Sequence, residues 1–361
     1  MMVKVKGAWF VTLTGLAMGL LASCVSTVEV EPFKPPVFPE PPDPPRYVWE
    51  RTITSSADVK AVSGEEKFKA AVTGIKRIGE GIGKPWGVAI HQGRMFVGNT
   101  AERVVHVFDF PTGGYFKIGD ADGPGQLGKP LGVAVDSQGR LFVVDATFKN
   151  VKIYSRDGAY LNTIGGKNEL NRPSGVAVTP GGERAFVVDT GGVDTPDHRV
   201  RVFDTQNGKI LFDIGGRGRE DGKFNLPNSA AFAGGKLYVT DGGNFRVQVF
   251  TAEGVFVRSI GQVGRQTGMF SRPKGVALDA NGNLFVVDTA FGNIQIFDPQ
   301  GQLLMAIGKR GPGAPGEFFL PAGIAIDEDG RVMLVDQFYS KVEIYRPVTL
   351  NPVAGYLAVP Q

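Results

Sequence analysis

Hydrophobic and polar residues alternate strictly in six short segments that recur along the chain. They read VVHVF, NVKIY, RVRVF, RVQVF, NIQIF and KVEIY. Alternation with a period of two predicts a β-strand that buries one of its faces. We therefore expect the central polar residues to lie on a solvent-facing side: His106, Lys152, Arg201, Gln248, Gln295 and Glu343.

Three further strand-like segments accompany each alternating segment. The first opens with a proline, as KPWGVAI, KPLGVAV, RPSGVAV, LPNSAAF, RPKGVAL and LPAGIAI, and the second ends in Asn or Asp, as MFVGN, LFVVD, AFVVD, LYVTD, LFVVD and VMLVD. The fourth ends in Ile-Gly, at Ile118, Ile164, Ile214, Ile260 and Ile307. Four short strands in a repeat of roughly 45 to 50 residues are typical of a propeller blade. The sequence predicts an all-β protein, a six-bladed β-propeller.

The sixth repeat lacks a fourth strand, because KVEIYRPV runs into a tail interrupted by proline. A segment with the pattern of a fourth strand, AVTGIKRIG at residues 71–79, precedes the first repeat. Pairing it beside Val342–Tyr345 would close the ring and cover the exposed sheet edge. We therefore expect an N-terminal strand to complete the last blade.

The first 23 residues have the pattern of a secretory signal. Lys4 and Lys6 precede an apolar run over residues 8–22, and small residues lead to Cys24, the only cysteine. The apolar run is shorter than the roughly 20 residues that span a bilayer, which favours a cleaved signal over a membrane anchor. The sequence LASC at residues 21–24 resembles a bacterial lipobox, which implies lipidation of Cys24. Val25, in place of aspartate, favours the outer membrane by resemblance to the sorting rule of enteric bacteria, and leaves the side of the membrane open.

A proline-rich segment follows the predicted lipidation site. Residues 28–47 read VEVEPFKPPVFPEPPDPPRY, and prolines favour an extended polyproline II chain over a helix or a central strand. We interpret residues 24–65 as a tether from the lipid, with a proline-binding partner as the alternative. The propeller is then expected over residues 66–348, with a tail over residues 349–361.

The recurring proline, glycine, aspartate and aromatic columns resemble NHL repeats, and residues 71–346 resemble an exported six-bladed NHL-repeat lipoprotein of bacteria. The resemblance is specific for the fold. It implies little about function, since NHL propellers include RNA readers, protein-docking platforms, lyases and lactonase-like enzymes. It also implies that loops from fourth to first strands and from second to third strands share one face, where ligands meet the central channel.

Composition narrows the function. The formal net charge of +3 is small and the basic residues are scattered, which argues against nucleic acid as a partner. With Cys24 assigned to lipid, no thiol remains for a disulfide, a metal-thiolate site or covalent haem attachment. We expect no cofactor apart from the covalent lipid. A structural cation in the insertion of the third repeat, beside Asp194 and Asp197, is kept as the alternative, although two carboxylates are few for such a site.

Residues just after each opening proline are expected to line the channel mouth. They are Trp86, Leu131, Ser174, Asn228, Lys274 and Ala322, and they include no carboxylate or histidine. A metal site needs several converging ligands, yet the chain has three histidines, His91, His106 and His198. We therefore predict no catalytic residues and no metal. A hydrolase or lyase acting on a small molecule at the mouth, around Asn228 and Ser174, is kept as the alternative.

The Asx residue that ends each second strand recurs in all six repeats. Such residues accept hydrogen bonds from the following turn. Because the feature recurs in every repeat, we interpret it as structural and not as a calcium ring. The residues are Asn99, Asp145, Asp189, Asp241, Asp288 and Asp336.

Aromatic and basic residues gather on the predicted ligand face. The aromatic residues interrupt the repeat between second and third strands, and they either pack between blades or meet a partner. Aromatic anchors ringed by cations suit a protein partner. The predicted partner surface comprises Trp86, Phe148, Phe245, Phe291, Phe338, Tyr339, Lys84, Lys129, Arg172, Arg272 and Lys274.

These observations predict a non-enzymatic scaffolding propeller, exported and held at the bacterial cell envelope through its lipid, with envelope proteins as partners. The resemblance to exported NHL lipoproteins adds a more specific expectation. It implies a role in the assembly or docking of extracellular electron-transfer components, such as multihaem cytochromes or an outer-membrane conduit.

Overall fold

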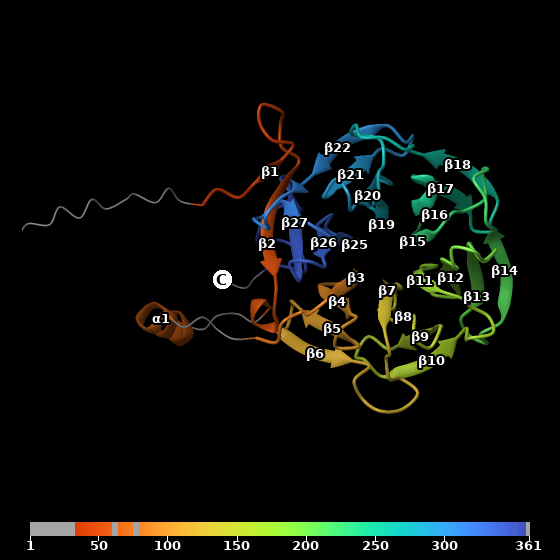
Figure 1. Ribbon diagram of the computed structural model, residues 1–361. Helices are drawn as coiled ribbons and strands as arrows, with labels where there is room; N and C mark the ends of the chain where they lie inside the picture. The colour runs from red at the N-terminus through yellow and green to blue at the C-terminus, as the bar shows by residue number, and fades with distance from the viewer. Residues whose placement is uncertain (1–32, 60–63, 75–78, 359–361) are drawn as a thin grey trace, which may run out of the picture. The chain divides into compact units, whose positions relative to one another are not determined.

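Six antiparallel β-sheets form a ring of blades around a central channel (Figure 1). The computed structural model describes residues 33–59, 64–74 and 79–358. The predicted signal segment and Cys24 lie outside these residues. The predicted all-β, six-bladed propeller is confirmed.

Blades 1 to 3 each contain four strands in chain order. Blade 1 comprises β3 (Pro85–His91), β4 (Arg94–Asn99), β5 (Val104–Asp109) and β6 (Gly114–Ile118). Blade 2 comprises β7 (Pro130–Val135), β8 (Leu141–Asp145), β9 (Asn150–Tyr154) and β10 (Tyr160–Ile164). Blade 3 comprises β11 (Pro173–Val178), β12 (Arg184–Asp189), β13 (Arg199–Asp204) and β14 (Ile210–Gly215).

Blades 4 and 5 repeat this order, and blade 6 departs from it. Blade 4 comprises β15 (Pro227–Ala233), β16 (Lys236–Asp241), β17 (Arg246–Thr251) and β18 (Phe256–Ile260). Blade 5 comprises β19 (Pro273–Leu278), β20 (Leu284–Asp288), β21 (Asn293–Phe297) and β22 (Leu303–Ile307). Blade 6 takes β25 (Pro321–Ile326), β26 (Val332–Asp336) and β27 (Lys341–Pro347) from the end of the chain, and β2 (Tyr47–Ile53) and β1 (Val37–Phe38) from its beginning.

The ring is closed by an N-terminal strand, but not by the segment that the sequence pattern selected. β2 pairs antiparallel with β27, where Ile53 lies opposite Val342. The predicted segment 71–79 is wrong for this role: Ala71, Val72 and Thr73 belong to helix α1 (Gly64–Thr73), and residues 75–78 lie outside the described residues. Ile53 is fully buried like the isoleucines of the other fourth strands, but Thr54 follows it where those strands have glycine. The closing strand thus lies within the range 24–65 that was assigned to the tether.

The glycine after a fourth strand has a steric cause. At Gly215 the backbone has a φ of +98°, and a Cβ there would lie 2.3 Å from the ring of Phe224. Phe224 is fully buried and packs in the hydrophobic core between blades 3 and 4. The Ile-Gly signature therefore marks the point where the chain makes room for a core side chain of the next blade.

The central polar residues of the third strands were expected to lie on a solvent-facing side of the sheet. This expectation is wrong. His106, Gln248, Gln295 and Glu343 are fully buried. Each of the last three bonds to the loop that enters its own blade: Gln248 donates to Lys223 O at 2.6 Å, Gln295 donates to Met269 O at 2.8 Å, and Glu343 accepts from Gly316 N at 3.0 Å. The alternation is that of a strand with an apolar face and a buried, hydrogen-bonded polar face.

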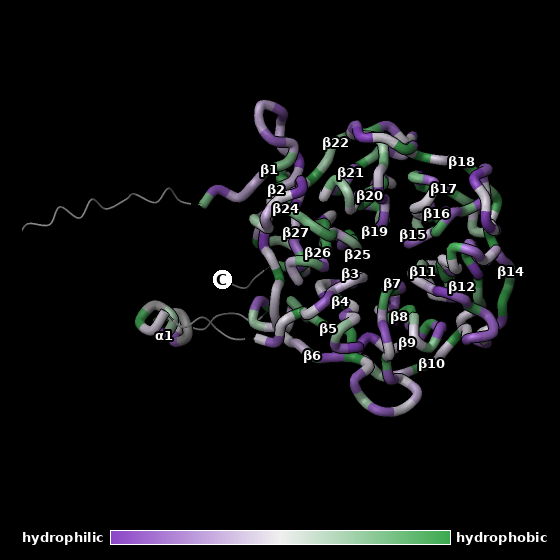
Figure 2. The backbone as a smooth tube through the Cα atoms, viewed as in Figure 1, coloured by the Kyte–Doolittle hydropathy of each residue, from purple (hydrophilic) through white to green (hydrophobic). Residues whose placement is uncertain are grey.

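Short elements lie outside the blades. They are the 3₁₀ turns η1 (Ser56–Asp58) and η2 (Gly242–Asn244) and the parallel pair β23 (Lys309–Arg310) and β24 (Glu317–Phe318). The fourth strands β14 and β22 are hydrophobic along most of their length (Figure 2), and Leu211 and Leu304 remain exposed there. No helix within the described ranges combines the length and hydropathy needed to cross a bilayer.

Candidate functional site

The channel mouth is a cavity of about 310 Å³ at the start of the first strands. Five of the six predicted mouth residues line it: Trp86, Leu131, Ser174, Asn228 and Lys274. Ala322 lines the adjoining narrow part of the channel, together with the glycines of the GVAV-type segments. The backbone direction explains this convergence, because every first strand begins at its proline and runs away from the mouth.

Lys274 is held at the mouth by residues of two other blades. Its Nζ lies 4.1 Å from the centre of the Trp86 ring and donates to Gln337 Oε1 at 3.3 Å. Burial, and then the neighbouring Arg272, lower the pKa of Lys274 to about 8, while Asp336 acts in the opposite direction. A cation held beside an aromatic face, and short of negative charge, favours an anionic ligand.

Ser174 and Asn228 are engaged in bonds between blades. Ser174 Oγ donates to Asn228 O at 2.8 Å, and Thr190 Oγ1 lies 2.6 Å from Ser174 Oγ. The Asn228 side chain donates to Pro273 O at 3.4 Å. Their polar atoms therefore join blades 3, 4 and 5 around the channel.

Three of the other predicted rim cations line the same cavity. Lys129, Arg172 and Arg272 are exposed at its edge, and no carboxylate is among the lining residues. Lys84 is exposed at the corresponding loop position of blade 1, but it is not one of the lining residues. The mouth thus has four cationic side chains, including Lys274.

The predicted aromatic residues divide into exposed and packed side chains. Phe148 and Phe338 are exposed, with 37% and 57% of their surfaces accessible. Phe245 packs against the core between blades 4 and 5, and Tyr339 donates its hydroxyl to Gly311 O at 2.9 Å. Phe291 is half-buried.

Phe338 forms an exposed aromatic pair in blade 6. Its ring centre lies 4.5 Å from that of Phe319, and the Arg310 guanidinium lies 4.2 Å from the Phe319 ring centre. Phe338 is one of the residues predicted from the sequence, whereas Phe319 and Arg310 are not. Both lie on the loop from the fourth strand of blade 5 to the first strand of blade 6.

The Asx residues at the second-strand ends are all fully buried, and all except Asp189 join the following turn to the loop before the first strand. Asp288 accepts from Ala290 N and Phe291 N in the following turn, and from Ser271 N in the loop before the first strand. Asp145, Asp336 and Asn99 make the same two kinds of bond. Asp189 likewise accepts from Arg172 N of the preceding loop.

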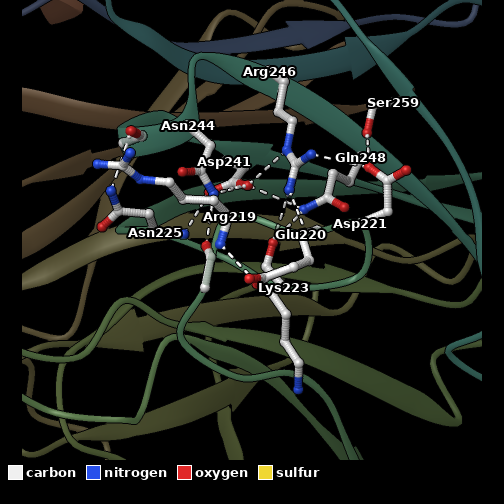
Figure 3. A network of polar contacts seen from close by, with 12 residues as sticks. Arg219, Glu220, Asp221, Lys223, Asn225, Asp241, Asn244, Arg246, Gln248 and Ser259 are labelled. Atoms are coloured by element: carbon white, nitrogen blue, oxygen red, sulfur yellow. Dashed lines mark hydrogen bonds and ion pairs between the residues drawn. The ribbon is translucent and has the colours of Figure 1, made fainter.

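Asp241 is the centre of a larger network of this kind (Figure 3). Its carboxylate accepts from Asn225 N at 2.7 Å, from the Asn244 side chain at 2.8 Å and from Arg246 Nε at 3.0 Å. Gln248 from the third strand also donates to it, at 3.0 Å. Burial raises the pKa of Asp241, while these donors act to lower it. The saturated carboxylate holds the loop over blade 4.

The three histidines lie apart. His91 is at the end of β3, and its Nδ1 lies 3.2 Å from Glu328 Oε1. His106 is buried within blade 1. His198 is also buried, and its Nδ1 accepts from Leu226 N at 3.2 Å. Within the described ranges, no group of three or more His, Cys, Asp or Glu side chains is arranged to hold a metal ion.

Gln337 contacts Lys274 at the mouth and was not predicted from the sequence; Ala146 and Thr190, which line the cavity, were not predicted either. Gln337 follows directly on Asp336, at a position where the other blades carry Thr100, Ala146, Thr190, Gly242 and Thr289. The longer amide reaches Lys274, whereas the hydroxyl of Thr289 donates instead to Pro321 O. The sequence feature that could have revealed Gln337 is its size, because the other five repeats have a small residue directly after their Asx residue.

Comparison with known families agrees with this architecture. The family described as "6-bladed beta-propeller" matches residues 275–347, and the NHL repeat matches residues 224–250. The protein is a six-bladed β-propeller, and one stretch of it, residues 224–250, matches the NHL repeat.

Two curated relatives match part of the propeller. Protein brain tumor of Drosophila melanogaster is 29% identical over 116 residues, covering 31% of this chain and 10% of that protein. NHL repeat-containing protein 2 of Gallus gallus is 35% identical over 101 residues, covering 26% of this chain and 13% of that protein. The matches thus span little more than a tenth of the length of either relative.

Two solved structures share the fold at low sequence identity. The streptogramin B lyase structure has a TM-score of 0.54 and 14% identity, over 73% of this chain and 93% of that one. XC5397 from Xanthomonas campestris, described as a gluconolactonase, has a TM-score of 0.55 and 18% identity, over 73% and 86% of the respective chains. At these identities the likeness concerns the fold.

Proposed function

We propose that this propeller is a binding protein that holds an acidic segment of a partner protein at its channel mouth. The observation that carries the proposal is the mouth cavity, whose lining contains four cations and no carboxylate. A partner carboxylate placed beside Lys274 would compensate its charge, and Trp86 would shield the pair from water.

The exposed Phe338–Phe319 pair supports a protein partner. Aromatic side chains are enriched where protein surfaces bind each other, and Arg310 stacked on Phe319 adds a further cation. β25 begins at the mouth, and the Phe338 loop lies at the same end of blade 6, because Asp336 accepts from Leu320 N at 3.3 Å.

Attachment to a membrane through Cys24 and export to the cell envelope belong to the same proposal. They rest on the LASC segment at residues 21–24. The role near multihaem cytochromes or an outer-membrane conduit remains a prediction from the resemblance to exported NHL lipoproteins.

The proposed binding of an acidic segment is tested by titrating a fluorescent hexaglutamate peptide with the protein and measuring the anisotropy. We expect Lys274→Met with Arg272→Gln to weaken binding at least tenfold, because two of the four mouth cations are removed. The matched control is Lys236→Met, which removes an exposed cation at the far end of β15 and β16 and should leave binding unchanged. Equal binding by the double variant and the parent protein would refute the assignment of the mouth.

A small-molecule hydrolase or lyase at the mouth is the second candidate. It is favoured by the pKa of Lys274 near 8, which leaves part of the amine neutral, and by the shared fold of the lyase and the gluconolactonase. Turnover of a lactone by the purified chain, lost in Lys274→Met, would support it over the binding role.

A further inference from the structure

A second pocket, of about 560 Å³, lies at the other end of the blades from the channel mouth. Its lining comes from the turns between the first and second strands of blades 5 and 6, from the start of β2 and from residues 347–350. No NHL repeat forms this pocket alone, because both ends of the propeller segment contribute to it.

The turn between the first and second strands carries the same aspartate in several blades. In blade 2, Asp136 accepts from Arg140 Nε through Oδ2 at 2.7 Å, four residues along the turn. In blade 5, Asp279 Oδ2 accepts from the Asn283 side chain at 2.7 Å. In each of these turns the other oxygen, Oδ1, accepts from backbone N–H groups. Both carboxylate oxygens are therefore bonded.

In blade 6 the corresponding arginine bonds elsewhere. Arg331 is fully buried, and its Nε donates to Glu50 Oε2 of β2 at 2.8 Å. Its two Nη atoms donate to Asp329 at 3.2 Å and to Ala354 O at 2.8 Å. The guanidinium thus joins the closing strand to the C-terminal segment, and it approaches Asp327 only to 3.9 Å, beyond hydrogen-bond distance.

Asp327 is left with one unsatisfied oxygen in the pocket wall. Oδ1 accepts from Arg331 N at 2.7 Å, but Oδ2 has no hydrogen-bond partner within the described residues, and Arg331 Nη1 approaches only to 3.9 Å. The side chain is 99% buried, since its accessible fraction is 1%. Burial raises the pKa of Asp327 to about 7. An unsatisfied buried carboxylate is costly to the free protein, and a cation bound beside it would offset that cost.

Apolar side chains also line the pocket, together with the carboxylates of Asp279, Glu328 and Asp329. The apolar residues include Tyr47, Phe285, Leu304 and Met305, and the ring centres of Tyr47 and Phe285 lie 6.2 Å apart in an edge-to-face arrangement. The lining also contains Arg46, which is exposed at the rim. A lining that combines carboxylates with apolar side chains suits a ligand with a cationic head and a hydrophobic body.

We propose that this pocket binds a small organic cation, with its ammonium or guanidinium group beside the Asp327 carboxylate and its apolar body against Tyr47 and Leu304. The site is independent of the channel mouth, since it lies at the opposite end of β19 and β25. An experiment can therefore refute the binding proposed at one site without affecting the proposal for the other.

Phenethylamine is the probe, titrated into the full chain at pH 8 and followed by ligand-observed NMR. Its neutral analogue 2-phenylethanol has the same apolar body. We expect the parent protein to bind the amine at least tenfold more tightly than the alcohol, and Asp327→Asn to abolish this preference. Asp136→Asn is the matched control and should keep it, because the Asp136 carboxylate is already bonded by Arg140.

A second variant tests the pocket independently in case Asp327→Asn does not fold. Asn281 is exposed on the pocket lining, so Asn281→Trp should fill the pocket and weaken amine binding at least tenfold without touching the core. The proposal is overturned if the parent protein does not bind phenethylamine, if it binds amine and alcohol equally, or if both pocket variants retain the preference.

Discussion

At the scale of single residues, the central side chain of the third strand links its blade to the loop that enters it in blades 2 to 6. Glutamine does this in blades 4 and 5, and histidine occupies the same position in blade 1. His106 lies between Asn99, 2.9 Å from its Nε2, and the Tyr115 hydroxyl, 2.7 Å from its Nδ1. Burial lowers the pKa of His106, with Glu102 acting in the opposite direction. The position tolerates different chemistry as long as the buried polar atoms are bonded.

His106 should make the fold sensitive to acid. Because its pKa is lowered in the folded protein, the unfolded chain takes up the proton first, and stability is lost as the pH falls below about 6.5. We expect His106→Gln to lose about 1 kcal/mol less of its unfolding free energy than the parent protein between pH 7.5 and pH 5. Urea unfolding at the two pH values measures this difference. The reciprocal variant Gln248→His should gain acid sensitivity; an unchanged pH profile in both variants would contradict the explanation.

At the scale of elements, the blades could be predicted because their signals are local and repeat six times. Opening prolines, terminal Asx residues and period-two strands each report on a few neighbouring residues. The closing strand β2 could not be found this way, because its pairing with β27 joins residues almost 300 positions apart and Thr54 replaces the usual glycine. The pocket at Asp327 was hidden for a related reason. The sequences VDSQGR and IDEDGR differ little, and only the fold shows that Glu50 bonds Arg331.

The buried Glu50–Arg331 pair should be a main attachment of β2 to blade 6. The pair is inaccessible to solvent on the Arg331 side and 8% accessible on the Glu50 side. We expect Glu50→Ala to lower the free energy of unfolding by about 3 kcal/mol, because it leaves a buried guanidinium short of an acceptor. Chemical denaturation measures the change. Glu40→Ala is the control: Glu40 is 67% accessible and pairs with Lys309, so its loss should cost less than about 1 kcal/mol. Similar losses in the two variants would show that the buried pair does not anchor the strand.

At the scale of the whole molecule, closure of the ring depends on both ends of the propeller segment. β2 covers the edge of β27, and Ile53 packs with Met333 and Ile344 of blade 6 and with Met95 of blade 1. The C-terminal segment adds Leu357, which is fully buried in the same cluster, and whose carbonyl accepts from Arg51 at 3.0 Å. The contacts of β2 thus connect the last blade to the first, where a ring of repeats would otherwise have an open seam.

Removal of β2 should open this seam. We compare a chain that begins at Pro35 with one that begins at Thr54, and follow thermal unfolding and the hydrogen exchange of amides in β27. The longer chain should behave as the full protein does. The shorter one should melt at least 10 °C lower and lose protection along β27, because the strand edge and the core around Ile53 become accessible to water. A synthetic peptide of residues 45–55 should restore protection by adding the missing strand in trans. Full protection of β27 in the shorter chain without the peptide would show that the ring is held by its six tandem repeats alone.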